Sequence, residues 1–378
     1  MLKEVFITNT NCITPLGFDV ATNIADIELG NAGVQLHADM NFSDKEFFGS
    51  IIDSQLINEA FSQISTRTHF TKLEKMLILA LHPLVTKKPT SRTALVLSST
   101  KGNISALQQM NGTVPEGAYL QHLAQTMADF FGFSTTPIVI SNACVSGILA
   151  VATAKRLIQG GMFDNAYVIA GDEFSKFVFS GFTAFQALSA QPCKPYSADR
   201  DGLNLGESAA AIYLTSDKSA IQDGSMKVIG DSAINDANHI SGPSRTGEGL
   251  YRSICNALLE AKVSADNINY ISAHGTATIY NDEMEAIAFN RAGLKEVPVN
   301  SLKGYYGHTL GASGLLETVI SIASARNNRL YKSAGFSEIG VSENINIVMQ
   351  NSDANIKYFL KTASGFGGCN TAVIFEKI

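Results

Sequence analysis

The sequence of 378 residues lacks the features that mark several large classes of protein. Basic residues are not in excess: Lys and Arg number 28 against 34 for Asp and Glu, so the net charge is −6 and no nucleic-acid partner is expected. No stretch approaches the roughly 18 consecutive apolar residues that span a bilayer. The residues before Thr8 form no apolar signal segment. We therefore expect a cytoplasmic protein with no membrane partner.

Cysteine is scarce and scattered. No C-x-x-C pair occurs, and no histidine stands at metal-ligand spacing from any of the five cysteines, which are Cys12, Cys144, Cys193, Cys255 and Cys369. The sequence therefore predicts neither a disulfide framework nor a metal site. A cysteine with a function would act as a thiol.

The composition is that of a folded protein, with 45% hydrophobic and 16% charged residues. A weak internal repeat divides the chain. Strand patterns open at 4–8 and again at 226–230, and a glycine turn followed by small and β-branched residues closes both parts, at 206–214 and 367–375. We expect domains at 1–218 and 219–378, although short apolar strands also resemble one another by chance.

The order of the patterns favours an α/β fold. A strand at 137–141, a helical run at 151–159 that stops at Gly160-Gly161, and a strand at 166–170 follow one another, as in crossover units of largely parallel sheets. Apolar residues run continuously through the strands, which predicts sheets covered by helices on both faces.

Cys144 lies in the short turn between the first of these strands and the helix. A helix N-terminus offers free N–H groups and a partial positive charge, which lower the pKa of a thiol and stabilise an oxyanion. The turn thus predicts a nucleophilic cysteine, against the alternative that Cys144 is a buried small residue like many free cysteines.

Two histidines also follow strand patterns and lie in glycine-rich turns, where sites of open α/β sheets are usually built. His274 is followed by two threonines and then by Asp282 and Glu285. His308 comes five residues after Lys303, ahead of a run of small residues that begins a helix. A glycine-rich segment at 365–370 adds one aromatic residue, Phe366, to the candidate site.

Taken in order, these motifs resemble the β-ketoacyl-acyl carrier protein synthases of the Cys-His-His type. The shared motifs are Asn-Ala-Cys-x-Ser-Gly at 142–147, Ala-His-Gly-Thr-x-Thr at 273–278, Lys303 and His308 with Gly311 and Gly314, and Gly-Phe-Gly-Gly-x-Asn at 365–370. The resemblance covers nearly the whole chain, and four ordered motifs are far more specific than one. It implies a thiolase-like fold of two similar α/β halves in a five-layer α-β-α-β-α sandwich.

The resemblance implies decarboxylative Claisen condensation of an acyl thioester with a malonyl thioester, in fatty-acid synthesis or a specialised polyketide or polyene-type pathway. Cys144 would carry the acyl group, and the N–H groups of Cys144 and Phe366 would hold the oxyanion. Phe366 and Gly367 would form a gate to the acyl pocket. His274 and His308 would stabilise the enolate as neutral N–H donors.

Further residues take supporting roles by the same resemblance. Lys303 would keep the imidazoles neutral, with Glu285 as its partner and Asp282 beside it. Thr276 and Thr278 would bind the phosphopantetheine arm. That arm comes with the acyl carrier protein, so no cofactor of the chain's own is expected.

An acidic acyl carrier protein would dock on a basic patch. The segment 66–75 resembles the docking helix of the family, with Arg67, Lys72 and Lys75 as candidates, and the alternative is an ordinary solvated helix face. The resemblance also implies a dimer, which we expect to be a homodimer, with a heterodimer with a related subunit left open.

Two other functions are compatible with the resemblance. One is a non-catalytic subunit like a chain-length factor, but such subunits usually lose the cysteine that stands here at 144. The other is a thiolase with a second catalytic cysteine, for which Cys369 is the candidate. The pair of histidines at 274 and 308 fits decarboxylation better.

Overall fold

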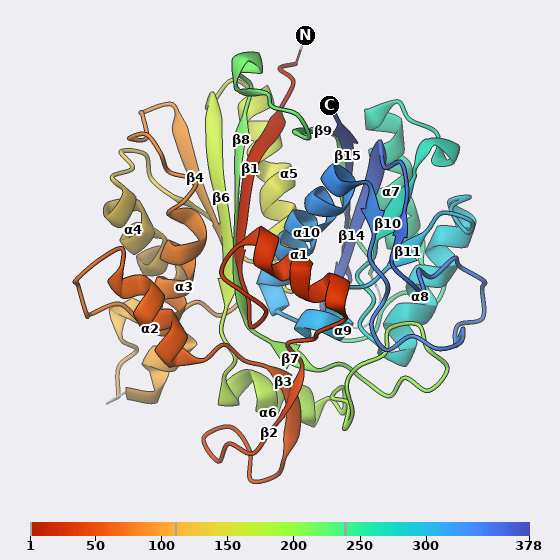
Figure 1. The fold of residues 1–378 in the computed structure, drawn as a ribbon, viewed down its shortest axis with the longest axis horizontal. Coiled ribbons are helices and arrows are strands. Elements are labelled where there is room, and N and C mark those ends of the chain that lie inside the picture. Colours follow the sequence, from red (N-terminus) through yellow and green to blue (C-terminus); the bar gives the residue numbers. More distant parts are fainter. Residues whose placement is uncertain (1, 110–111, 238–239) are drawn as a thin grey trace.

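The computed structural model describes residues 2–109, 112–237 and 240–378. Ten strands form its main sheet (Figure 1). Those of the N-terminal half are β1 (Phe6–Ile13), β4 (Thr93–Ser98), β5 (Ile138–Ile140), β6 (Asn165–Asp172) and β8 (Ser208–Thr215). Those of the C-terminal half are β9 (Met226–Asn235), β10 (Tyr270–Ser272), β11 (Val299–Asn300), β14 (Tyr358–Gly365) and β15 (Cys369–Lys377).

The strand order β11-β10-β14-β15-β9-β1-β8-β6-β4-β5 shows that each half builds a five-stranded sheet. The two sheets join only where β1 meets β9, through the residue pairs Phe6 with Lys227 and Ile7 with Met226. The connection between the halves runs from Thr215 to Met226 and includes η3 (Lys218–Ala220). The boundary expected after residue 218 falls in this connection and stays a prediction.

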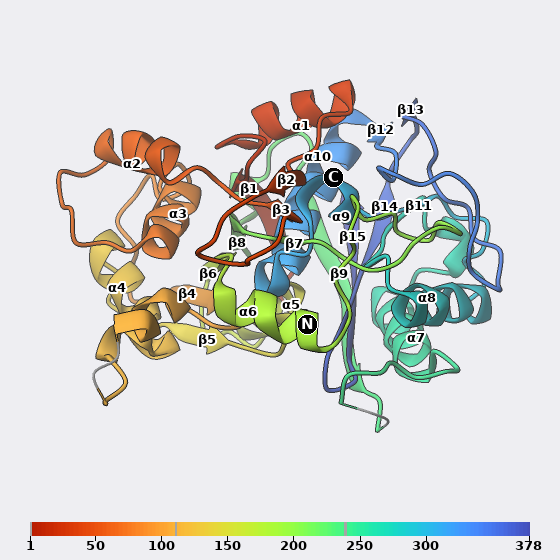
Figure 2. The same ribbon diagram turned by 90° about the horizontal axis from the view of Figure 1, so that it is seen from below.

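Helices cover both faces of each sheet. Beside the N-terminal half lie α2 (Ser54–Ser62), α3 (Lys72–Leu81) and α4 (Leu120–Phe131), and beside the C-terminal half lie α7 (Glu248–Ala261) and α8 (Ile279–Arg291). Between the sheets run α5 (Ser146–Gln159) and α10 (Ser313–Asn327). Both views show this sequence of layers (Figures 1 and 2), so the expected five-layer sandwich is confirmed.

The remaining elements are short and lie around this sandwich. The helical ones are α1 (Val20–Leu29), α6 (Lys176–Ala184), α9 (Lys303–Tyr306), η1 (Ile104–Gln109), η2 (Glu116–Ala118), η4 (Ala265–Asn267) and η5 (Leu310–Ala312). The strands are β2 (Gln35–His37), β3 (Phe47–Ser50) and β7 (Leu205–Gly206) in one small sheet, and β12 (Arg329–Leu330) with β13 (Ser352–Asp353) in another.

Successive side chains of a strand point to opposite faces of the sheet, and here the side chains on both faces are apolar. This explains why helices cover both faces of each sheet. In β4, Ala94 and Val96 face the central helices, whereas Leu95 and Leu97 face the outer ones, and all four are buried. A strand buried on both faces reads as an uninterrupted apolar run. No helix in the described ranges combines the length and the apolar character needed to cross a bilayer.

The expectation of largely parallel sheets is wrong for the strands nearest the centre. Pairing is parallel for β4 with β5 and β6 and for β10 with β11 and β14, but antiparallel for β1, β8, β9 and β15 with their neighbours. The physical reason is clearest at β14 and β15, because the glycine-rich segment between them makes a tight hairpin, and a tight turn returns the chain antiparallel. A glycine-rich hairpin turn is also what this segment favours when its sequence is taken alone, and the structure confirms it.

Candidate active site

Cys144 lies in the turn between β5 and α5, as expected. Ala143 takes a left-handed conformation, with φ +45°, which folds the chain sharply just before the thiol. The Ser146 side chain fixes this turn, since its hydroxyl donates to the Ala143 carbonyl at 2.6 Å and accepts the N–H of Asn142 at 2.7 Å. The turn directs Cys144 toward the C-terminal half while leaving its side chain buried.

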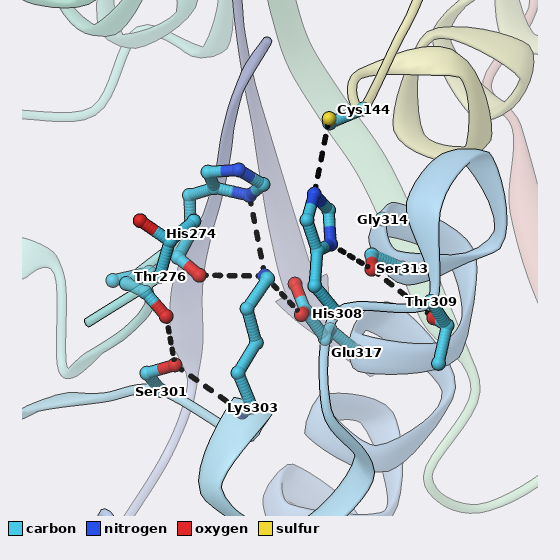
Figure 3. Close-up of polar contacts among 12 residues, drawn as sticks. Cys144, His274, Thr276, Ser301, Lys303, His308, Thr309, Ser313, Gly314 and Glu317 are labelled. Atoms are coloured by element: carbon cyan, nitrogen blue, oxygen red, sulfur yellow. Dashed lines mark hydrogen bonds and ion pairs between the residues drawn. The ribbon is translucent and has the colours of Figure 1, made fainter. Parts of the chain in front are cut away.

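The two histidines meet this thiol from the other half of the chain (Figure 3). His308 Nε2 lies 3.0 Å from Cys144 Sγ, and the rings of His274 and His308 are 5.3 Å apart and nearly perpendicular. One nitrogen of each ring and the sulfur lie within 4.8 Å of one another. Segments 130 and 164 residues away from Cys144 therefore converge on it, as the motif order predicts.

A close crossing of the central helices makes this approach possible. Gly147 on α5 faces α10, where a Cβ at this position would lie 2.7 Å from the Gly311 carbonyl oxygen and 2.7 Å from the Leu315 nitrogen. Gly314 on α10 is equally close to α5, at 2.7 Å from the Ile148 nitrogen. The two backbones touch, so the ends of the helices that carry the thiol and the His308 turn lie side by side.

Lys303 connects the histidines to a buried carboxylate. Its ammonium donates to the His274 carbonyl at 2.6 Å, lies 3.3 Å from His274 Nδ1 and pairs with Glu317 at 2.6 Å. An ammonium only donates hydrogen bonds, so Nδ1 of His274 is the acceptor and the proton of the neutral ring sits on Nε2. Lys303 thereby fixes the tautomer of His274.

Glu285 is not the partner of Lys303, and the expectation that it would be is wrong. Its carboxylate instead accepts the backbone N–H groups of His274 at 2.9 Å and Gly275 at 2.6 Å. Asp282 does the same for Thr276, at 2.9 Å. Both acids project from α8 beneath the backbone of the His274 turn, and Glu317 reaches Lys303 from α10 on the other side.

Burial is the main cause of the pKa shifts of Cys144, His274 and His308. It raises the pKa of Cys144 from 9.0 to about 11, and the charge of Lys303 and a hydrogen bond from the Phe366 N–H only partly oppose it. The expectation of a lowered thiol pKa is therefore wrong. Burial, aided by the charge of Lys303, lowers the pKa of both His274 and His308 well below 6.5, so both imidazoles are neutral at pH 7, as predicted.

The site opens into a cavity of about 440 Å³. Cys144, both histidines, Thr276 and Thr278 line it, together with Phe366 and two aromatic residues of the α6 region, Phe182 and Phe185. The Phe366 ring stacks on Phe182 at 5.7 Å and meets Phe185 edge-on at 5.2 Å. Phe366 is 36% exposed and lines the same cavity as the thiol.

The Phe366 backbone is held close to the thiol. A Cβ on Gly365 would lie 3.0 Å from the Cys144 nitrogen, and the Phe366 N–H bonds the Cys144 sulfur. Gly367 continues the hairpin with φ +87°, while its carbonyl accepts from Asn235 at 2.8 Å. The predicted roles of these residues in an oxyanion hole and a gate stay predictions, now with a compatible geometry.

The basic segment differs from its expected form. The helix expected over 66–75 begins only at Lys72, so Arg67 lies in the loop before it. Lys72 pairs with the buried Glu207 and donates to the Ile52 carbonyl at 2.8 Å. Its ammonium group is thus already bound by partners within the fold. Lys75 bonds Asn58 at 2.8 Å. A docking role for these three cations stays a prediction, and it is weakest for Lys72.

Several supporting residues were missed in the sequence. Ser313 bonds Nδ1 of His308 at 3.0 Å, and Glu317 lies one turn further along α10. Lys361, on β14, ion-pairs with Glu317 at 2.7 Å. The available signal for Glu317 was a charged residue in the first, small and apolar half of the predicted helix, because a charge in a buried segment needs a buried partner.

Cys369 does not join the catalytic group. Its thiol donates to the Asn142 side chain at 2.8 Å. Within the described residues, the only compact cluster of metal-ligating atoms is Cys144, His274 and His308. The Lys303 ammonium beside His274 would repel a cation there, so this cluster is better suited to proton transfer than to metal binding.

The chain belongs to the β-ketoacyl synthase family, and its fold is thiolase-like. The N-terminal domain of β-ketoacyl synthases matches residues 4–220, and the C-terminal domain matches residues 226–337. These two matches cover both sides of the site, including all three residues of the Cys-His-His group.

Among sequence relatives, a 3-oxoacyl-[acyl-carrier-protein] synthase 2 from Rhizobium meliloti (strain 1021) is 34% identical over 255 residues, which are 63% of this chain and 60% of that protein. The alignment thus spans less than two thirds of the relative. A putative mitochondrial 3-oxoacyl-[acyl-carrier-protein] synthase from Schizosaccharomyces pombe is 24% identical over 429 residues, covering 100% of this chain and 99% of that protein.

Solved structures agree on the fold. A β-ketoacyl synthase from Burkholderia phymatum superposes with a TM-score of 0.88 at 24% identity and full coverage of both chains. The ishigamide ketosynthase/chain length factor gives 0.90 at 21% identity, again with full coverage. A ketosynthase in complex with its chain length factor from Xenorhabdus doucetiae gives 0.85 at 24% identity, covering 100% of this chain and 98% of that chain.

Proposed function

We propose that the protein is a 3-oxoacyl-acyl carrier protein synthase that joins an acyl group to a malonyl unit with loss of carbon dioxide. One observation carries the proposal: Cys144 Sγ lies 3.0 Å from Nε2 of His308, beside the second neutral imidazole of His274. A thiol accounts for acyl transfer, and two neutral N–H donors account for stabilisation of an enolate.

In the acylation step, Cys144 attacks the carbonyl carbon of the incoming acyl thioester. A thiol with a pKa of about 11 is protonated at neutral pH, so it needs a base, and Nε2 of His308 is in contact with it. The new bond joins Cys144 sulfur to the acyl carbon, and the proton leaves with the thiol of the carrier. The N–H groups of Cys144 and Phe366 are suited to hold the tetrahedral oxyanion.

In the condensation step, the malonyl thioester loses carbon dioxide and leaves an enolate. His274 presents its Nε2–H, because Lys303 occupies Nδ1. The Ser313 hydroxyl bonds His308 Nδ1 and also lies 3.1 Å from Thr309, and since a hydroxyl both donates and accepts, His308 can carry its proton on either nitrogen. The enolate carbon then attacks acyl-Cys144, and the released thiolate is reprotonated.

The proposed partner is an acyl carrier protein that delivers both thioesters on a phosphopantetheine arm. The cavity beside Thr276 and Thr278 supports this, since their hydroxyls line the path to Cys144. No further cofactor is needed for the chemistry. Structural neighbours whose titles name a ketosynthase with a chain length factor support the alternative of a heterodimer with a related subunit. The homodimer expected from the sequence stays part of the proposal.

The direct test is the intact mass of the purified protein after incubation with a panel of acyl-carrier thioesters, with Cys144→Ser as the matched control. The proposal predicts an added acyl mass on the wild type alone and release of carbon dioxide when malonyl carrier follows. A folded wild-type protein that forms no adduct with any chain would refute the proposal and favour a non-catalytic partner subunit.

A further inference from the structure

Lys361 is a fully buried lysine to which the proposed mechanism gives no role. It lies on β14 opposite Ser272 of β10, in the parallel pair that ends just before His274. Its neighbour Leu360 packs in the outer core, whereas Phe359 and Ala363 pack in the central one. Lys361 shares the face of Phe359, so its side chain enters the central layer toward α10.

The ammonium of Lys361 is surrounded by oxygen atoms. It donates to the carbonyls of Thr362 at 2.7 Å, Ser272 at 3.1 Å and Ala273 at 3.3 Å, and it pairs with a carboxylate oxygen of Glu317 at 2.7 Å. We call these four oxygens the carbonyl cage. Three carbonyl oxygens and one carboxylate oxygen can accept hydrogen bonds from an ammonium group. The same oxygens can also serve as ligands of a small free monovalent cation.

The cage is connected to the proposed catalytic group through two routes. Glu317 is shared, because its other oxygen pairs with Lys303 at 2.6 Å, and the Lys303 ammonium bonds the His274 carbonyl and faces His274 Nδ1. The Ser272 and Ala273 carbonyls belong to the two residues that directly precede His274. A cation in the cage therefore fixes the backbone of His274 and the orientation of Glu317 at once.

The carboxylates of Glu317 and Glu285 favour a cation at this place, whereas the neighbouring ammonium of Lys303 disfavours it. Glu317 lies between two ammonium groups, and Glu285 is the next carboxylate that acts on Lys361. Burial lowers the pKa of Lys361, and Glu317 opposes this effect. Without the ammonium, one oxygen of Glu317 and three buried carbonyls would lose their shared partner, which is costly for buried polar groups.

We infer that Lys361 is a positioning residue that serves as a built-in monovalent cation: its ammonium fills the carbonyl cage and holds the Glu317, Lys303 and His274 chain in its working geometry. The inference rests on the proposed function for its effect on catalysis, and on the cage alone for its effect on cation binding. It predicts that a free ammonium ion can replace the side chain once the side chain is removed.

The experiment compares Lys361→Ala, which empties the cage, with Lys361→Met, which removes the charge but keeps the space filled. We expect Lys361→Ala to lower kcat for condensation by at least about tenfold, with little change in KM, because Lys361 is buried and does not line the cavity. Ammonium chloride should restore kcat of this variant, and tetramethylammonium chloride at the same concentration should not. Lys361→Met should stay impaired in both salts.

A second readout does not depend on activity. The melting temperature of Lys361→Ala should rise with ammonium concentration and not with tetramethylammonium, because a ligand that binds only the folded state stabilises it. The wild type should show no such difference. If the wild type condenses nothing, the proposed function fails while this thermal test still decides the inference.

Three results would overturn the inference. The first is full condensation by Lys361→Ala without ammonium. The second is a loss of activity that ammonium restores equally in Lys361→Met, which would point to an effect of salt. The third is a Lys361→Ala protein whose melting temperature does not rise with ammonium concentration, or that stays unfolded when ammonium is added.

Discussion

The two central helices begin at the same site but hold it in different ways. At the start of α5, the strained turn at Ala143 and the hydroxyl of Ser146 place Cys144 through backbone contacts. At the start of α10, the side chains of Ser313 and Glu317, one turn apart on the same face, hold His308 and Lys303.

The difference separates two tasks. The proposed nucleophile, Cys144, is positioned by the backbone of its turn, whereas the proposed proton-handling residue His308 and its neighbour Lys303 are held by buried polar side chains. The α5 helix has a buried ion pair too, but Lys155 meets Asp231 far along the helix, away from the thiol. Substitutions that keep the size of a side chain but remove its charge should therefore disturb the positions of His308 and Lys303 at α10 more than the position of Cys144 at α5.

The largest effect is expected at the thiol itself. Cys144→Ala should form no acyl adduct and should lower the rate of condensation by at least about 10⁴-fold, since loss of a nucleophile removes the covalent step. Decarboxylation of malonyl carrier should persist, because both histidines remain. Mass spectrometry and carbon dioxide release measure the two steps, with Cys255→Ala on α7 as the control. Condensation at the wild-type rate would contradict the assignment of Cys144.

Glu317→Gln should be the next most severe change. It leaves two buried ammonium groups, Lys303 and Lys361, without their carboxylate, and breaking a buried ion pair in this way costs about 3–5 kcal/mol. Urea denaturation should show that loss in the free energy of unfolding. Glu260→Gln is the matched control on the α5 side, where the carboxylate is 39% exposed and the loss should be smaller. Equal losses would erase the contrast between the helices.

The pH dependence of alkylation sharpens the comparison without any mutation. Because burial raises the pKa of Cys144 to about 11, its thiolate fraction at pH 8 should be about 100-fold lower than that of a thiol with a pKa of 9.0. The rate of reaction with iodoacetamide should rise about tenfold per pH unit and level off near pH 11. A plateau reached below pH 8 would mean that the helix N-terminus outweighs burial.

The close crossing should respond to a single methyl group. Gly147→Ala places a Cβ 2.7 Å from two backbone atoms of the facing segment, so α5 and α10 must move apart. We expect the free energy of unfolding to fall by about 1–3 kcal/mol and condensation to fall with it. Gly117→Ala, where a Cβ would meet nothing within 4 Å, is the control. An unchanged rate would show that the distance between Cys144 and His308 does not depend on this contact.

The smallest effect is expected from Ser313→Ala. It removes one hydrogen bond to His308 Nδ1, worth about 1 kcal/mol, and should slow acylation of Cys144 by about fivefold. Ser321→Ala, on the same helix, removes a hydroxyl that donates to the Glu317 carbonyl at 2.7 Å and should leave the acylation rate unchanged. Stopped-flow or quenched mass spectrometry measures that rate. The same slowing in both variants would indicate a general weakening of α10.

The sequence was sufficient for the parts of the site that depend on local order. A strand, a small-residue turn and a helix place Cys144, and a strand followed by glycines places His274 and His308. The α/β class and the covering of both sheet faces by helices follow from continuous apolar strands that alternate with helices, whereas the five-layer arrangement follows from the resemblance to the β-ketoacyl synthases. These features are encoded within a few residues of each position, and the structure confirms them.

Other features depend on contacts between distant segments. The pKa of Cys144 is set by how completely the central layer excludes water, which no segment encodes by itself. The partner of Lys303 is Glu317 because α10, and not α8, passes beside its ammonium. The antiparallel pairing of β14 with β15 depends on the hairpin at Gly367, whose φ of +87° a composition rich in glycine permits without requiring. The other antiparallel pairs of the main sheet join strands that are far apart in the sequence.

The close crossing of α5 and α10 at Gly147 and Gly314 also limits how a substrate could reach the thiol. Because the two helix backbones touch there, the halves cannot swing apart as hinged lobes without pulling Cys144 away from His308. Access must therefore come from the rim, where the Phe366 side chain and the α6 aromatics stand over the cavity. For the proposed reaction, the close crossing therefore leaves the aromatic residues that line the cavity, and not the central helices, to accommodate acyl chains of different length.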